Sequence, residues 1–278
     1  MNGPIDPLPA EGTTATDDLP AVNYERLGTT GLITIDRRHR RNAIDGITAA
    51  ALHDAFLRFE SDADARVLVL TGAGTEAFCA GADLKAVESF AGRLDAPEGP
   101  LGITRLASSK PTIAAISGYC VAGGLELALW CDLRIATESS TLGLAERRFG
   151  VPLLDGGTQR LPRTVGLGRA LELILTGRLV SAAEALAMGL ITEVVADGKH
   201  LQRALELGDE LARFPQRALL ADRSAVFAGL GNELSAGLAI EASNGPDTFA
   251  EALRGAGWFT AGQGRSGAAV AGTGTSGS

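Results

Sequence analysis

The pattern of apolar and polar positions changes once along the chain, near residue 197. Before it, short apolar runs rich in β-branched residues, such as 67–71 and 112–117, are typical of strands buried on both faces. They alternate with runs such as 44–61, where apolar residues recur at helical spacing. These repeated strand–turn–helix units predict an α/β core.

After residue 197 the pattern becomes entirely helical, and it predicts helices at 201–214, 216–229 and 234–256, the last interrupted at Ser243-Asn244-Gly245-Pro246. The two ends of the chain show no periodicity, and their Gly, Pro, Ser and Thr content is typical of disordered segments. The sequence therefore predicts four segments. They are a disordered leader at 1–20, a core at 21–197, a C-terminal helical region at 198–262 and a disordered tail at 263–278.

A strand-to-helix corner lies in the middle of the chain. The strand at 112–117 leads through Ala122-Gly123-Gly124 into a helical run at 125–130. Backbone N–H groups at such a corner point outward with the positive end of the helix dipole behind them. The corner can therefore hold a negatively charged oxygen.

A second corner of the same kind occurs at Gly81-Ala82-Asp83, before a predicted helix at 84–90. Two such corners can supply two converging donors, the N–H groups of Ala82 and Gly123. The alternative is two unrelated joints, with Asp83 acting as a helix cap.

Two glutamates accompany these corners. Glu126 lies in the first turn of the helix after Gly123, and Glu146 lies twenty residues further along the chain. Two carboxylates beside an anion-binding corner are suited to acid–base chemistry on a carbonyl compound. Taken singly, Glu126 could be a helix glutamate favoured by the dipole, and Glu146 an exposed charge neutralised by Arg147 or Arg148.

Composition and charge exclude several classes of function. A formal net charge of −8 argues against binding to nucleic acid or to an anionic membrane. Cys79, Cys120 and Cys131 lie inside apolar runs without paired spacing, which favours reduced core thiols over disulfides or metal ligands. No apolar run is long enough to span a bilayer, and the N-terminus does not resemble a signal peptide. These features predict a cytoplasmic protein.

Two further motifs have competing explanations. The cluster Arg37-Arg38-His39-Arg40-Arg41 is either a solvated loop or a binding site for nucleotide phosphates, which guanidinium groups bind bidentately.

Residues 72–77, Gly-Ala-Gly-Thr-Glu-Ala, match the dinucleotide fingerprint formally. That fingerprint must open directly into a helix. Here an extended run at 78–81 follows, so nicotinamide binding is disfavoured.

The segments around both corners resemble the crotonase (enoyl-CoA hydratase/isomerase) superfamily. The matching segments are, in order, NAID, FCAGADLKAV, SGYCVAGGLELALWCDLRIA, LGLAERRFGVP, GGTQRLPR and LTGRLVSAAEALAMGL. The resemblance covers roughly residues 24–259. It implies a right-handed spiral of ββα units and a C-terminal helical region that packs subunits into a homotrimer or a dimer of trimers.

The resemblance also implies an activity and the residues that carry it. The expected activity is hydration of an enoyl-CoA, without a metal or redox cofactor, because coenzyme A enters as part of the substrate. Glu126 and Glu146 match the acid–base pair of crotonase-type hydratases, and Ala82 and Gly123 match their oxyanion hole. The expected acyl-CoA contacts are Arg38, Ala80, Asp83, Leu84 and Lys85.

The sequence departs from the hydratase pattern at two places. Ala122 replaces the first residue of a triple glycine, and Leu154-Asp155 occupies a loop where hydratases have small residues. Dienoyl-CoA isomerases carry an aspartate near the position of Asp155, so an isomerase that uses Asp155 is an alternative. Asp155 could instead cap or brace the Gly156-Gly157 turn. A relative that binds acyl-CoA without turnover is the non-enzymatic alternative.

Overall fold

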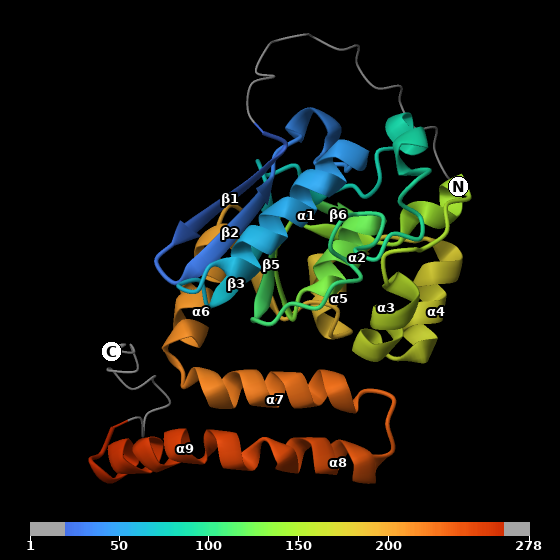
Figure 1. Ribbon diagram of the computed structural model, residues 1–278. Coiled ribbons are helices and arrows are strands. Elements are labelled where there is room, and N and C mark those ends of the chain that lie inside the picture. Colours follow the sequence, from blue (N-terminus) through green and yellow to red (C-terminus); the bar gives the residue numbers. More distant parts are fainter. Residues whose placement is uncertain (1–19, 264–278) are drawn as a thin grey trace.

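The computed structural model describes residues 20–263, so the predicted leader and most of the predicted tail lie outside the described residues. Within them, ten strands form two sheets and the helices cover the sheets (Figure 1). The predicted α/β class is therefore confirmed.

The larger sheet has six strands in the order β1-β2-β3-β5-β7-β10. Only β1 and β2 are antiparallel, and every later neighbour pairs in parallel. The strands are β1 Val22–Leu27, β2 Thr30–Ile35, β3 Val67–Gly72, β5 Thr112–Ile116, β7 Leu133–Thr137 and β10 Glu193–Val195. Strands β3 and β5 are buried along their whole length, as the uninterrupted apolar runs predict.

A smaller sheet of four strands, in the order β4-β6-β8-β9, lies beside the first. Its strands are β4 Ala77–Cys79, β6 Tyr119–Val121, β8 Thr141–Gly143 and β9 Val180–Ser181. Residues 72–77 lead into β4 and not into a helix, which removes the geometry that a dinucleotide fingerprint needs. Cys79, Cys120 and Cys131 are all buried and free, as predicted.

Helices of the core pack on both sheets. They are α1 Gly46–Ser61, α2 Gly123–Trp130, α3 Gly157–Val165, α4 Leu167–Thr176, α5 Ala182–Ala187 and α6 His200–Arg213. Helix α2 is buried at every position, which explains why its sequence is apolar on all sides except at Glu126. Two predictions were incomplete. Helix α2 begins two residues earlier than predicted, and α3 was not predicted at all.

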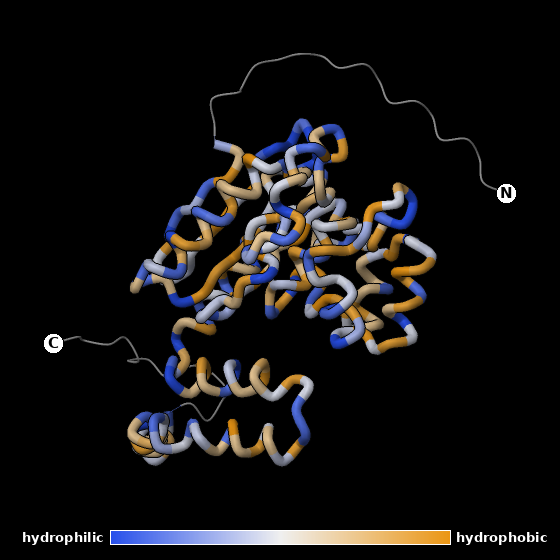
Figure 2. The backbone as a smooth tube through the Cα atoms, turned by 45° about the vertical axis from the view of Figure 1, so that its right-hand side comes forward, coloured by the Kyte–Doolittle hydropathy of each residue, from blue (hydrophilic) through white to orange (hydrophobic). Residues whose placement is uncertain are grey.

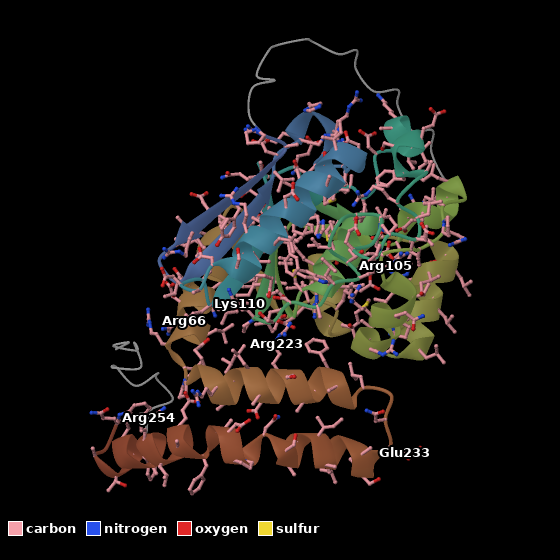
Figure 3. The ribbon with its side chains drawn as sticks, in the orientation of Figure 1. Arg66, Arg105, Lys110, Arg223, Glu233 and Arg254 are labelled. Carbon is pink, nitrogen blue, oxygen red and sulfur yellow. The ribbon has the colours of Figure 1, made fainter. Side chains whose placement is uncertain are left out.

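Three helices at the C-terminal end extend away from the core (Figures 1 and 2). They are α7 Gln216–Gly229, α8 Leu234–Ser243 and α9 Gly245–Thr260, and they contact mainly each other. Arg223 on α7 points towards the core, where it pairs with Asp132 at 2.8 Å and donates to the carbonyl oxygen of Ser108 (Figure 3). No helix within residues 20–263 combines the length and the apolarity needed to cross a membrane.

Candidate active site

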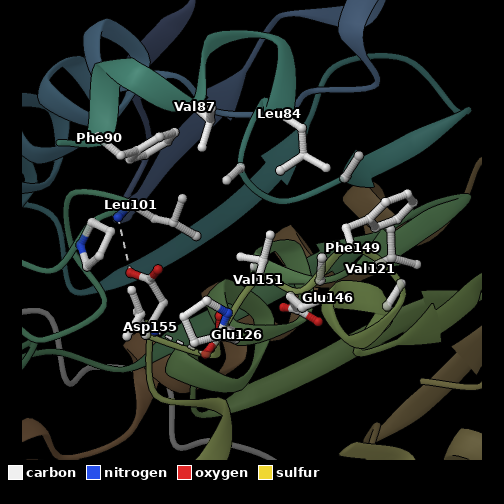
Figure 4. Close-up of a pocket in the computed structure, with 18 of the residues that line it drawn as sticks. Leu84, Val87, Phe90, Leu101, Val121, Glu126, Glu146, Phe149, Val151 and Asp155 are labelled. Carbon is white, nitrogen blue, oxygen red and sulfur yellow. Dashed lines mark hydrogen bonds between the residues drawn. The ribbon is translucent and has the colours of Figure 1, made fainter. Parts of the chain in front are cut away.

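A cavity of about 390 Å³ lies between the start of α2 and the 3₁₀ helix Leu84–Phe90 (Figure 4). Most of its lining is apolar, but three carboxylates, those of Glu126, Glu146 and Asp155, also line it. The large apolar side chains around it are those of Leu84, Val87, Phe90, Leu94, Leu101, Val121, Phe149, Val151 and Leu154.

The two predicted donor corners meet at this cavity. Gly81 has a φ of +88°, and a Cβ placed on it would lie 2.7 Å from the backbone N of Gly123. Only glycine allows so close an approach at such a φ. Ala82 and Gly123 both line the cavity, and a Cβ placed on Gly123 would lie 3.7 Å from the backbone N of Ala82. The structure thus places the two predicted donors side by side.

The backbone pattern leaves both N–H groups available. Gly123 is the first residue of α2, so its N–H has no acceptor within the helix. Ala82 forms a bridge with Ile44, but that bridge uses the N–H of Asp83 and the carbonyl oxygen of Gly81. The N–H of Ala82 takes no part in it.

Ala122, directly before α2, has an unusual backbone conformation. Its φ of 55° and ψ of −134° are readily adopted by glycine and carry strain in an alanine. A glycine, which the family resemblance implies at this position, would adopt this conformation without strain. A Cβ placed on Gly81 would lie 2.9 Å from the Cβ of Ala122, so the alanine leaves no room for a side chain at position 81.

Glu126 is almost fully buried, and backbone donors hold it. Its Oε1 accepts hydrogen bonds from the N–H of Gly157 at 2.7 Å and from that of Asp155 at 3.0 Å. The pKa of Glu126 is raised to about 8, chiefly by burial and in addition by the charges of Asp155 and Glu146, against the opposing effect of the two N–H groups. A Cβ on Gly157 would lie 2.9 Å from Oε1, so glycine permits this contact.

Glu146 is buried in the same cavity, on the 3₁₀ helix Ala145–Phe149. Neither of its carboxylate oxygens has a hydrogen-bond partner among the described residues. Burial raises its pKa to about 7. The expected alternative of an exposed charge is wrong, because Glu146 is only 6% exposed. Arg148 donates to the carbonyl oxygen of Gly177, whereas the charge of Arg147 partly opposes the rise in the pKa of Glu146.

Asp155 fastens a neighbouring segment to the cavity. Its Oδ1 accepts from the N–H of Leu101 at 3.1 Å (Figure 4). The same oxygen accepts from the hydroxyl group of Thr104. Burial raises the pKa of this carboxyl group above its usual range. The carboxylate thus braces residues 101–104, and its hydrogen bonds do not cap the Gly156-Gly157 turn. Leu101 and Ile103 are fully buried.

The expected acyl-CoA contacts divide into two groups. Ala80 and Leu84 line the cavity, whereas Arg38, Asp83 and Lys85 are not among the residues that line it. Arg38 pairs with Asp36 at 2.8 Å. Asp83 caps the helix that begins at Leu84 by accepting from the N–H of Lys85 at 3.1 Å, so the capping role considered from the sequence is present.

The arginine cluster is largely engaged in ion pairs with the protein itself. Arg37 pairs with Asp45 at 2.8 Å and with Asp83 at 3.2 Å, and Arg41 pairs with Glu76 at 2.7 Å. These pairs reduce the positive charge that the cluster offers to a phosphate. A nucleotide contact there remains a prediction.

Sequence reasoning missed the residues that support the three carboxylates. Arg160 on α3 donates to the carbonyl oxygens of Asp155 and Thr104, which fixes the loop whose N–H groups hold Glu126. An arginine in an undetected helix gives no periodic signal.

Within residues 20–263, no three His, Cys, Asp or Glu side chains are grouped to hold one metal ion. The expectation of chemistry without a cofactor stays a prediction.

Comparisons with known proteins agree on one family. The model of the enoyl-CoA hydratase/isomerase family matches residues 25–260. The mitochondrial enoyl-CoA hydratase domain-containing protein 2 of Bos taurus is 38% identical over 221 residues, which are 75% of this chain and 73% of the relative. The carnitinyl-CoA dehydratase of Salmonella typhi is 39% identical over 192 residues, which are 68% and 75% of the two chains.

A solved structure extends the similarity to the whole fold. The enoyl-CoA hydratase of Mycobacterium marinum superposes with a TM-score of 0.83 at 34% identity, covering 92% of this chain and all of its own. The predicted crotonase-type spiral is therefore confirmed. Relatives at nearly equal identity are named for different acyl groups, so similarity alone does not identify the substrate.

Replacing Glu126 by Gln tests the burial of this carboxyl group. Because its pKa is raised from 4.5 to about 8, the folded protein binds more protons than the unfolded chain between these values. The resulting stabilisation is complete below about pH 4.5 and is lost as the pH rises through about 8. From pH 5 to 8, we expect the free energy of unfolding of the wild type to fall relative to that of Glu126→Gln, by up to about 1.4 kcal/mol per pH unit.

Urea denaturation across that pH range measures the difference, with the exposed Glu88→Gln as control. A difference between wild type and Glu126→Gln that stays constant with pH would contradict the raised pKa.

Proposed function

Because the chain belongs to the enoyl-CoA hydratase/isomerase family, we propose that it adds water across the α,β double bond of a trans-2-enoyl-CoA to give a 3-hydroxyacyl-CoA. The observation that carries the proposal is the burial of Glu126 and Glu146 in one cavity with the N–H groups of Ala82 and Gly123. Coenzyme A is part of the substrate, and no further cofactor is required.

The first step is polarisation of the substrate. The thioester carbonyl oxygen lies between the N–H groups of Ala82 and Gly123, which stabilise the negative charge that develops as the enolate forms. Preorganised donors of this kind contribute on the order of 3 kcal/mol each to transition-state stabilisation. Electron withdrawal towards that oxygen makes the β-carbon electrophilic, so that water can attack it.

The two glutamates complete the reaction. One carboxylate accepts a proton from the attacking water, and the other carboxyl group delivers a proton to the α-carbon. Their raised pKa values, about 8 for Glu126 and about 7 for Glu146, favour a single proton shared by the pair near neutral pH. The unbonded oxygens of Glu146 suit a group that binds the water.

An isomerase that uses Asp155 is the second candidate, since Asp155 lines the same cavity and its pKa is raised. Its hydrogen bonds with Leu101 and Thr104 favour a supporting role instead. A relative that only binds acyl-CoA would keep its affinity in Glu126→Gln and would produce no new compound. A cytoplasmic location remains a prediction.

Product mass after incubation with a short trans-2-enoyl-CoA tests hydration. We expect the wild type to add one water, and Glu126→Gln and Glu146→Gln each to lower kcat by about 10²–10⁴-fold, because each removes a proton-transfer group. Glu88→Gln is the matched control and keeps the wild-type rate. An unchanged mass for every chain length sinks the proposal. A substrate rearranged without a change in mass, through a reaction lost in Asp155→Asn, establishes the isomerase.

We also propose that the protein assembles into a homotrimer or a dimer of trimers through α7, α8 and α9. None of the residues of these three helices is buried in the single chain. Their exposed large apolar side chains are Val226, Phe227, Leu230, Leu234, Leu238, Phe249, Leu253 and Phe259. Helices with so much apolar surface and so little burial need a partner, and a second copy of the chain provides one.

Analytical ultracentrifugation tests this assembly. We expect a mass of three or six times the 28.5 kDa of one chain, and dissociation when Leu234 and Leu253 are both changed to Glu. Ile47→Glu is the control, since Ile47 is an exposed apolar residue on α1. A monomeric wild type would show that these helices do not join subunits.

A further inference from the structure

Leu154 lies between two cavities. It lines the site cavity and also a second cavity of about 770 Å³ on the other side of residues 152–156. Along this segment, Pro152 and Asp155 line the site cavity, whereas Leu153 and Gly156 line the second one. Leu154 is the one residue that lines both. The segment is therefore a partition, and the Leu154 side chain is the part of it that both cavities share.

The backbone of this partition is anchored from several sides. The guanidinium group of Arg105 donates to the carbonyl oxygen of Leu154 at 3.2 Å, and that of Arg160 donates to the carbonyl oxygen of Asp155 at 2.9 Å. The N–H of Asp155 is bonded in turn to Glu126. Because the backbone of residues 152–156 is held in this way, it cannot move to fill a gap. Shortening the Leu154 side chain therefore leaves an opening between the two cavities.

Part of the lining of the second cavity is apolar and offers surface to an acyl chain. This part comes from α2 and the end of α7, through Leu129, Trp130, Phe227 and Leu230. The rest includes the charged side chains of Arg105, Asp132, Arg134, Arg160 and Arg163. The Leu154 side chain is 36% exposed, and no other described residue lines both cavities. An acyl chain that extends past the reacting carbons towards this wall meets the leucine.

We propose that Leu154 determines acyl-chain specificity by closing the site cavity, so that the protein selects short enoyl-CoA substrates. This inference rests on the proposed hydration, because it assumes that the acyl group occupies the site cavity. The Leu154 side chain lines the site cavity, and its volume there is space that an acyl chain cannot occupy.

The test compares kcat/KM for trans-2-enoyl-CoA substrates of four, eight and twelve carbons. In the wild type, we expect the four-carbon substrate to be preferred. In Leu154→Ala, we expect the ratio of kcat/KM for the twelve-carbon substrate to that for the four-carbon substrate to rise by about tenfold or more. Leu154→Val is expected to give an intermediate gain.

Leu153→Ala is the matched control, because it removes the same atoms from the adjacent residue but enlarges the second cavity alone. Equal chain-length profiles for all variants, or the same gain in Leu153→Ala, would overturn the assignment. If the wild type hydrates no substrate, the proposed reaction fails separately. The affinity for saturated acyl-CoAs of the same lengths, measured by calorimetry, then decides the role of Leu154 without turnover.

Discussion

The burial of three carboxyl groups in a small apolar cavity is the constraint on which this structure depends. An ionised carboxylate removed from water is strongly disfavoured unless donors compensate it, so such groups take up protons instead. The structure compensates the three unequally. Glu126 receives two backbone N–H groups and Asp155 receives a backbone N–H and a hydroxyl, while Glu146 receives none within the described residues. The carboxylates of Glu126 and Asp155 are therefore held by protein donors, whereas the carboxylate of Glu146 is available to bind a small polar molecule.

The fold supplies the compensation through backbone groups rather than charged side chains. The donors to Glu126 come from the loop that Arg160 fixes, and the two N–H groups of the corners come from segments that touch at Gly81. Backbone dipoles placed by strands and helices cannot reorient freely, so they are preorganised for a charge that forms only during reaction. Ala122, directly before α2, has a φ of 55°, which is unfavourable for alanine. The corner before α2 therefore keeps its backbone geometry even at the cost of strain in this residue.

Much of this arrangement could be predicted from the sequence. Uninterrupted apolar runs located β3 and β5, and helical spacing located α1 and α7 to within two residues, because burial imposes those patterns. The corners and both glutamates followed from glycine positions and from family resemblance. The position of Asp155, the support from Arg160 and the burial of residues 101–104 could not be predicted. Each depends on contacts between segments about 50 residues apart, which leave no local pattern.

In the proposed reaction, Glu126 and Glu146 share one proton. The pH dependence of kcat/KM for a short enoyl-CoA tests this sharing most directly. With pKa values of about 7 and 8 for the pair, the account predicts a bell-shaped profile with its maximum between them. Activity falls at lower pH as both groups become protonated, and at higher pH as the shared proton is lost. A rate that stays constant from pH 5 to 9 would contradict the account.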